Sequence, residues 1–222
     1  RPLEEKTPAP IAAAPASATP KTDKSCPTPN EWPLKFIKQI PRTPAITSFL
    51  FEPPQGLNFR PGQYLQFLFD EHTRGNTSLN KLLSFSSVPG EKYIEVTKRR
   101  SESAFCQRLW GLKPDEAVRI FGPMGDCVFY EEYQKIALLT GGIGITPVVS
   151  ILGYIASQGL KTDVSLLYSN RTEKDIAFKD LFDSYAQKYP NIKLVYTVDY
   201  EKPADNQISF GMINKDFVLK HV

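Results

Sequence analysis

The sequence contains few of the residues on which metal, disulfide and triad chemistry depend. It has three cysteines, Cys26, Cys106 and Cys127, and two histidines, His72 and His221. An odd number of widely spaced cysteines argues against a disulfide framework and against a cysteine-ligated metal or iron–sulfur site, and it mildly favours a reducing compartment. Two histidines give little support to a metal cluster or a Ser-His-Asp triad. We therefore expect no metal site and a cytoplasmic location.

The sequence also lacks a charge excess of either sign and any long apolar run. Its 27 basic and 24 acidic residues leave a net charge of +3, which argues against a nucleic-acid binder dominated by phosphate contacts. No apolar run is long enough to form a transmembrane segment. With 41% hydrophobic residues among 222, the chain can bury a substantial core and could hold two modest domains.

Residues 1–31 differ in composition from the rest. The first 30 include seven prolines and six alanines, and such a stretch cannot bury enough surface to offset its ordering entropy. It lacks the basic start and apolar stretch of a secretory signal. We expect a disordered linker, and the start at Arg1 fits either a preceding segment or a trimmed terminus.

Residues 32–132 have the pattern of short strands separated by turns. Turn residues such as Pro53-Pro54-Gln55-Gly56 separate the strands, and one helix is expected from Ser103 through Trp110. Regularly spaced short strands favour a small antiparallel Greek-key-type barrel, because closure removes exposed sheet edges. The expected strands are 35–40, 46–52, 63–69, 92–98 and 117–121.

Residues 133–222 alternate strands with helices. Apolar side chains at helical spacing predict one helix from Pro147 and a second beginning near Ile176. This alternation implies a parallel sheet with right-handed crossovers, in which ligands bind beyond the carboxyl ends of the strands. The segments Thr140–Thr146 and Ser169–Thr172 and the residue Asp199 should therefore lie at one edge. The expected strands are 135–140, 163–168 and 192–198.

A glycine-rich turn stands between the first of these strands and its helix. It contains Gly141, Gly142 and Gly144, and the helix that it opens offers free amides and a positive dipole end to a phosphate. The turn is not the full dinucleotide fingerprint, and it lacks the Lys-Ser/Thr ending of a nucleotidase loop. Glycines also serve ordinary tight turns. The expected convergence of the strand ends favours phosphate binding.

From about Trp32 to its end, the chain resembles the ferredoxin reductase and cytochrome b5 reductase superfamily. The resemblance implies a barrel that carries FAD, an α/β domain that binds NADH or NADPH, and a redox protein or domain as electron acceptor. Four landmarks in the family's order carry it: Arg60-Pro61-Gly62-Gln63-Tyr64, Lys81-Leu82-Leu83-Ser84-Phe85-Ser86-Ser87, Gly122-Pro123-Met124-Gly125-Asp126 and the glycine-rich turn.

The second landmark matches the family's flavin motif. Lys81 stands where the family has the arginine that holds the FAD pyrophosphate, and lysine cannot form the bidentate fork. Leu83, next to Leu82, replaces the aromatic residue that stacks on the flavin ring. Ser84, a predicted catalytic residue, matches the residue whose hydroxyl lies near flavin N5. Taken alone, this segment also fits an ordinary barrel strand.

Two further segments resemble flavin-binding parts of the family. Val96, Thr97 and Lys98 resemble the next strand that lines the flavin. Ala104-Phe105-Cys106 resembles a second pyrophosphate clamp, in which amides at a helix start are the donors. A catalytic Cys106 is less favoured than a buried one, because no histidine is nearby in sequence. Cys127 is expected in the core.

The resemblance also assigns residues to the nicotinamide dinucleotide. Thr146, the second predicted catalytic residue, would lie at the domain junction within reach of both cofactors. Ser169, Asn170 and Arg171 would line the dinucleotide cleft, although they fit a capping turn nearly as well. Asp199 would accept hydrogen bonds from a ribose 2′-OH and repel a 2′-phosphate there, which favours NADH.

The family's Cys-Gly-Pro segment, which touches the nicotinamide, and its final helix are not found after the third expected strand. We therefore expect a chain that binds FAD but transfers hydride poorly alone. Two alternatives remain open: a non-catalytic flavin-binding electron-relay module of a larger assembly, and a dinucleotide-binding dehydrogenase without flavin. The residues do not define the oligomeric state.

Overall fold

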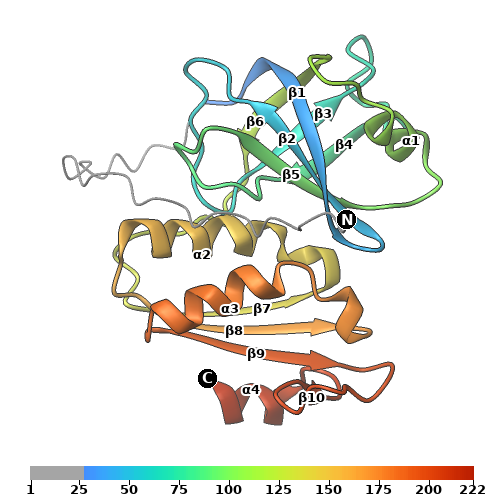
Figure 1. Ribbon diagram of the computed structural model, residues 1–222. Coiled ribbons are helices and arrows are strands. Elements are labelled where there is room, and N and C mark those ends of the chain that lie inside the picture. The colour runs from blue at the N-terminus through green and yellow to red at the C-terminus, as the bar shows by residue number, and fades with distance from the viewer. Residues whose placement is uncertain (1–27) are drawn as a thin grey trace, which may run out of the picture.

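The computed structural model describes residues 28–222, which form two lobes stacked on each other (Figure 1). Most of the predicted linker, 1–31, therefore lies outside the described residues. The first strand, β1 (Asn30–Thr43), begins two residues before the expected start of the barrel. Asn30 is already paired with Gly122, so residues 30 and 31 belong to the barrel sheet.

The first lobe is a six-stranded antiparallel barrel, as the sequence predicts. Its strand order is β4-β3-β6-β1-β2-β5, and a bridge between Phe85 and Val96 joins the two outer strands. Tightly packed aromatic rings fill the interior, for example Phe36 and Phe51 with centroids 5.5 Å apart. The remaining elements are β2 (Ile46–Glu52), β3 (Tyr64–Leu68), β4 (Asn80–Ser84), β5 (Ile94–Arg99), α1 (Ala104–Trp110) and β6 (Ala117–Met124).

The second lobe is a four-stranded parallel sheet, also as predicted, with strand order β10-β9-β8-β7. Helices α2 and α3 cover one face of the sheet, and α4 lies beside β9 and β10, at the end of the lobe away from the barrel (Figure 1). Its elements are β7 (Lys135–Gly141), the 3₁₀ helix η1 (Gly142–Ile145), α2 (Thr146–Gln158), β8 (Asp163–Asn170), the 3₁₀ helix η2 (Glu173–Asp175), α3 (Lys179–Lys188), β9 (Ile192–Val198), β10 (Ser209–Phe210) and α4 (Lys215–His221).

Three features of the second lobe differ from what the sequence predicted. The helix expected near Ile176 begins at Lys179, because Phe178 has φ +62° and interrupts the helical path. The strand β10 was not predicted. A helix, α4, follows the third strand although none was expected, and the Asn214 side chain caps it by accepting from Phe217 N. Both unpredicted elements are short and largely exposed, so their sequences carry little periodic signal.

Strand β7 forms one edge of the parallel sheet. Among residues 28–222 it pairs with β8 alone. Its sequence, Lys-Ile-Ala-Leu-Leu-Thr-Gly, is nearly continuous in apolar residues, yet Leu139 is 50% exposed. Continuous apolar runs are typical of strands buried on both faces of a parallel sheet. β7 therefore has the sequence of a central strand in the position of an edge strand.

The two lobes pack directly against each other. Ile46 of β2 is buried within the core of the second lobe. The Arg42 guanidinium lies 4.7 Å from the ring centre of Phe178, which precedes α3, and Phe129 N donates to Pro61 O over 3.1 Å. These contacts hold the carboxyl edge of the parallel sheet in a fixed position relative to the barrel.

Candidate functional site

The glycine-rich turn leads from β7 into one continuous helical path, η1 followed by α2. Gly141 is extended, with φ −138°, and Gly142 has φ +51°, a conformation that favours glycine. A Cβ at Gly142 would lie 2.6 Å from Nη2 of Arg99, so the guanidinium of β5 lies directly over the turn. Because the first amides of a helical path lack internal acceptors, this turn offers donors beside a cation.

Thr146 and Gly144 complete the inner side of the turn. The Thr146 side chain is buried, and its Oγ1 donates to Ile143 O over 3.2 Å. A Cβ at Gly144 would lie 2.9 Å from Thr140 Oγ1. The Thr146 hydroxyl is thus bonded within its own turn, and reaching a ligand would require it to exchange this bond.

The ends of β8 and β9 lie next to the turn, as the parallel topology requires. Ser169 pairs in register with Gly141, and Asp199 N donates to Asn170 O over 3.2 Å. The Arg171 guanidinium lies 4.8 Å from the ring centre of Tyr200. The structure therefore brings Gly141, Ser169, Asn170 and Asp199 together at the carboxyl edge of the sheet.

Asn170 has a buried side-chain amide whose hydrogen-bonding groups are unsatisfied within the described residues. It is 5% exposed, and neither its amide nitrogen nor its amide oxygen forms a hydrogen bond within residues 28–222. Capping of the following turn is performed by Thr172 and Asp175, which form a reciprocal capping box. Because buried polar groups are normally bonded, Asn170 fits a ligand contact better than a local structural role.

Strand β4 carries the residues expected at the flavin. Leu83 is buried in the barrel core, whereas Leu82 on the opposite face is 59% exposed. Lys81 and Ser84 are partly exposed. The exposed apolar surface on this strand is thus that of Leu82, because side chains alternate between the two faces of a strand.

The other predicted flavin residues are mostly interior. Val96 and Phe105 are fully buried in the barrel core. The Thr97 hydroxyl lies 2.8 Å from both Ser48 Oγ and Ser86 Oγ. Lys98 is partly exposed and Ala104 is exposed. Among these residues only Lys98 has a polar side chain open to solvent, and the others could reach a ligand chiefly through their backbone.

Cys106 is buried, and its amide is not free. Its N–H donates to the Ser103 side chain over 3.3 Å, and the Ser101 hydroxyl donates to its Sγ over 3.2 Å. Burial alone raises the pKa of the Cys106 thiol, but hydrogen bonds from Ser101 and Ser103 outweigh it, so the pKa lies below its usual value. Cys127, expected in the core, is exposed; its carbonyl rather than its thiol faces Gly62.

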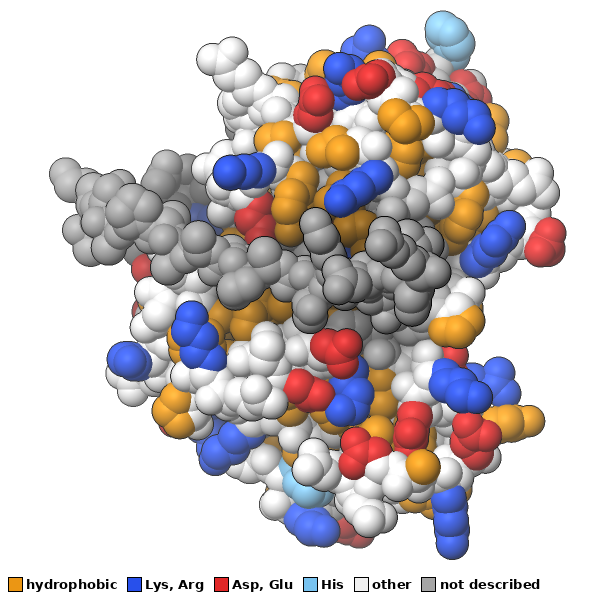
Figure 2. All heavy atoms as spheres, viewed as in Figure 1, with side chains coloured by type: hydrophobic (Ala, Val, Ile, Leu, Met, Phe, Trp, Pro, Cys, Tyr) orange, Lys and Arg blue, Asp and Glu red, His pale blue; other side chains and the backbone are white. Residues whose placement is uncertain are grey.

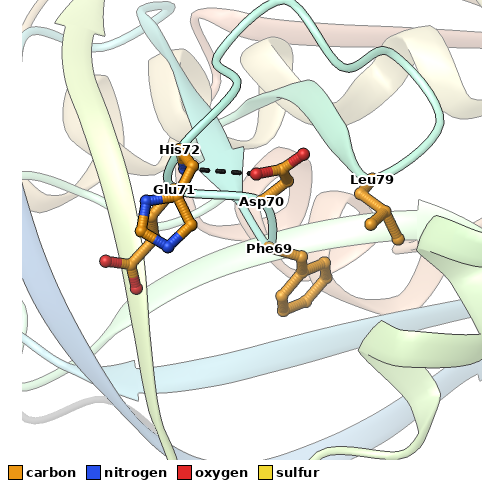
Figure 3. A pocket seen from close by; sticks show the side chains of 5 residues that line it. All are labelled: Phe69, Asp70, Glu71, His72 and Leu79. Carbon is orange, nitrogen blue, oxygen red and sulfur yellow. Dashed lines mark hydrogen bonds between the residues drawn. The ribbon is translucent and has the colours of Figure 1, made fainter.

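A hollow of about 430 Å³ lies at the loop between β3 and β4. Phe69 and Leu79 line one side of the loop, and Glu71 and His72 point to the other (Figure 3). Asp70 holds the loop by accepting from His72 N and Thr73 N. The hollow is separate from the glycine turn, but it adjoins the end of β4 at which Lys81 lies.

The surface carries charged side chains of both signs. Acidic and basic side chains are interspersed over both lobes on the face shown in Figure 2. Within the described residues, no group of three or more His, Cys, Asp or Glu side chains could hold a metal ion. None of the helices in residues 28–222 is long and apolar enough to cross a membrane.

Sequence reasoning missed two residues at the turn. Arg99 directly follows the predicted Lys98, but only the approach of the two lobes brings it over Gly142. The Tyr168 hydroxyl donates to Gly142 O over 3.1 Å, and its place in an apolar strand gave no signal of this bond.

Comparisons with known proteins agree with this architecture. A family model described as "Oxidoreductase NAD-binding domain" matches residues 138–222. The NADH-cytochrome b5 reductase 2 of Debaryomyces hansenii is 32% identical over 149 residues, which cover 65% of this chain and 50% of that protein. An NADH-cytochrome b5 reductase-like protein of Arabidopsis thaliana is 34% identical over 208 residues, covering 89% of this chain and 63% of that protein.

A solved structure shows the same fold. The cytochrome b5 reductase domain of Ulva prolifera nitrate reductase superposes with a TM-score of 0.71 at 21% identity, covering 87% of this chain and 82% of that chain. The chain spans half or less of the length of several curated fungal relatives that it matches.

Proposed function

The chain belongs to the ferredoxin reductase and cytochrome b5 reductase superfamily, and on this premise we propose that it is an FAD-dependent oxidoreductase that uses NADH. One observation carries the proposal: the glycine turn of the parallel lobe faces the barrel, with Arg99 of the barrel over Gly142. A dinucleotide held at such a turn would lie between the lobes, where a second cofactor on the barrel can meet it.

The residues present fit both cofactors. For the nicotinamide dinucleotide, the supporting observation is the buried and unbonded amide of Asn170 beside a helix start. For FAD, Lys81 supplies a cation on β4, Leu82 an exposed apolar surface and Ser84 a hydroxyl at the strand end. The hollow beside Leu79 adjoins the end of β4 at which Lys81 lies.

FAD, when bound, supplies the ability to accept a hydride and to release electrons singly. The protein's own residues bind and orient. Lys81 neutralises diphosphate charge, although without the two-point grip of an arginine. The Ser84 hydroxyl can donate a hydrogen bond to an acceptor at the end of β4. The helical path that begins at Gly142 holds the second dinucleotide, so that both cofactors meet at the lobe boundary.

Asp199 supports the preference for NADH over NADPH. Asp199 is exposed directly after β9, and its backbone N–H donates to the carbonyl oxygen of Asn170. An anionic group there accepts from a ribose 2′-OH and repels a 2′-phosphate. Replacing it, Asp199→Ser, should raise the activity ratio of NADPH to NADH, and an unchanged ratio would contradict the assignment.

The electron acceptor that we propose is a redox protein or a quinone. Similar proteins are named as NADH-cytochrome b5 reductases and as a coenzyme Q6 reductase. Exposed Leu82 on β4 gives the barrel an apolar surface beside the proposed flavin site. Reduction of cytochrome b5 and of a soluble quinone by NADH, measured side by side, would separate the two classes.

The experiment that tests the proposed function is a visible spectrum of the purified protein before and after anaerobic NADH. We expect a yellow protein, or one that becomes yellow with added FAD, whose flavin absorbance bleaches slowly with NADH, in keeping with the poor hydride transfer expected from the sequence. No flavin binding would overturn the proposal. Flavin binding without bleaching would favour an electron-relay module instead.

A cytoplasmic location is part of the proposal. Both cysteines in the described residues, Cys106 and Cys127, are free thiols, which suits a reducing compartment. Fractionation of cells that express the tagged protein tests the location, and recovery in a membrane or secreted fraction would contradict it.

A further inference from the structure

Arg99 is a cation whose side chain has no hydrogen-bond or ion-pair partner in the part of the chain that the structure describes. It ends β5, it is exposed, and within residues 28–222 its guanidinium forms no ion pair or hydrogen bond. Instead it lies over the glycine turn, 2.6 Å from the point that a Cβ at Gly142 would occupy. The guanidinium therefore extends from the barrel over the backbone of the second lobe, and no acidic side chain of residues 28–222 forms an ion pair that would hold it there.

The groups beneath Arg99 suit an anion. The helical path begins at Gly142, where backbone amides lack internal acceptors. The Tyr168 hydroxyl donates to Gly142 O over 3.1 Å and so supports the backbone of the turn. Asn170, two residues further along β8, adds a buried amide whose polar atoms have no partner. The guanidinium of Arg99, the free amides of the turn and the amide of Asn170 thus lie in one small region.

Electrostatics agrees with this geometry. Burial raises the pKa of the Tyr168 hydroxyl to about 12, and the neighbouring Asn170 side chain, the Ala177 backbone and, after them, the charge of Arg99 act on it in the opposite direction. The hydroxyl therefore stays protonated at neutral pH and keeps its hydrogen bond to Gly142 O beside the guanidinium.

We propose that Arg99 binds the diphosphate of the nicotinamide dinucleotide from the barrel side, opposite the glycine turn. The dinucleotide is then held by both lobes. Arginine suits this role because its planar fork matches phosphate oxygens. The inference rests on the proposed function, since Arg99 would bind the same nicotinamide dinucleotide.

The test is calorimetric titration of the full chain with NADH and with ADP-ribose, which carries the same diphosphate but no nicotinamide. Arg99→Ala should weaken both ligands at least tenfold at low salt and by less at high salt, because exposed charges are screened. Arg99→Lys should fall between. Arg100→Ala is the matched control: its guanidinium lies 5.9 Å from the Trp110 ring centre, and we expect a change of less than twofold.

The outcomes distinguish a failure of the role of Arg99 from a failure of the proposed function. Equal affinities of wild type and Arg99→Ala would overturn the role of Arg99 and leave the proposed function intact. A loss of FAD affinity instead of NADH affinity would assign the cation to the other diphosphate. If the wild type bound neither NADH nor ADP-ribose, the proposed function would fail together with this inference. Melting temperatures of all variants check that they are folded.

Discussion

Ser150 of α2 donates a hydrogen bond over 2.7 Å to the carbonyl oxygen of Ser87, and both side chains are buried. One turn later on the same helix, a Cβ at Gly153 would lie 2.6 Å from Cγ2 of Val88. Helix and barrel therefore meet with no side chain of position 153 between them. This contact fixes α2 against the segment that begins at Ser84.

Adding a methyl group at this contact should push the lobes apart. Gly153→Ala would force Val88 or α2 to move, at a cost of about 1–3 kcal/mol for overpacking. Flavin reduction by NADH should slow by more than the FAD affinity falls, because misplacement by about 1 Å can cost a large factor in rate. Stopped-flow absorbance measures the first quantity, and flavin titration measures the second.

Restoring the space at this contact is the control. Val88→Ala removes the methyl group that the new Cβ meets, so the double variant should recover most of the reduction rate. A double variant as slow as Gly153→Ala alone would show that the contact does not set the spacing of the lobes.

The unbonded amide of Asn170 should lower the stability of the ligand-free protein, and a bound ligand should offset this cost by bonding the amide. Asn170→Leu, similar in shape, should leave the free energy of unfolding unchanged or raise it by about 1–3 kcal/mol, the usual penalty of an unsatisfied buried group. The same change should weaken NADH binding. Urea titration and calorimetry measure the two effects, and lower stability would indicate that Asn170 supports the fold instead.

The ion pair of Arg42 and Glu95 should be costly to break. Their side chains are 3.0 Å apart and 26% and 5% exposed. Arg42→Met would leave the carboxylate buried without its cation, and a loss of about 3–5 kcal/mol is typical. Lys35→Met, which breaks an exposed pair with Asp115, is the control and should change stability little. Equal losses in both variants would contradict the importance of burial.

Glu91 should make stability depend on pH. Burial raises its carboxyl pKa above 4.5, against the opposing hydrogen bond from Val88 N. Above pH 4.5 the unfolded chain releases this proton while the folded protein still holds it, so stability falls as pH rises through that window. Glu91→Gln should lose less stability over the same rise. Melting temperatures between pH 4 and 8 test this, and parallel curves would count against it.

The carboxyl group of Asp70 should make stability depend on pH in the direction opposite to that of Glu91. The hydrogen bond from Asn76 is the main cause that lowers its pKa below 3.8. Its stabilising contribution is therefore present above pH 3.8 and is lost as pH falls through the lower, folded value. Asp70→Asn should consequently lower stability at neutral pH, and the curves of the variant and the wild type should converge as pH falls below 3.8.

The sequence predicted those parts of the fold that local pattern determines. Two strands, Ile46–Glu52 and Ile192–Val198, begin and end where the pattern of their residues indicates. The helix after Ser103 also begins where expected, since a capping serine is a local signal. The late start of α3 was missed because the left-handed backbone at Phe178 depends on packing rather than on local preference.

The candidate site was predictable only in part. The parallel topology correctly brought the glycine turn, Ser169 and Asp199 to one edge, because that edge follows from strand order. The position of Arg99 over Gly142 depends on how the lobes dock, which no short-range pattern encodes. The burial of Leu83 and exposure of Leu82 likewise depend on the register of β4 with β3.

Among residues 28–222 the outer margin of β7 pairs with no strand, and this has a consequence for handling the protein. A flat, apolar outer strand with free amides and carbonyls invites a further strand to add itself, and natural proteins usually blunt such margins with charge or proline. Here only Lys135, at the beginning of the strand, carries a charge. Concentrated samples should therefore self-associate through this margin, and Leu139→Lys should keep them dispersed.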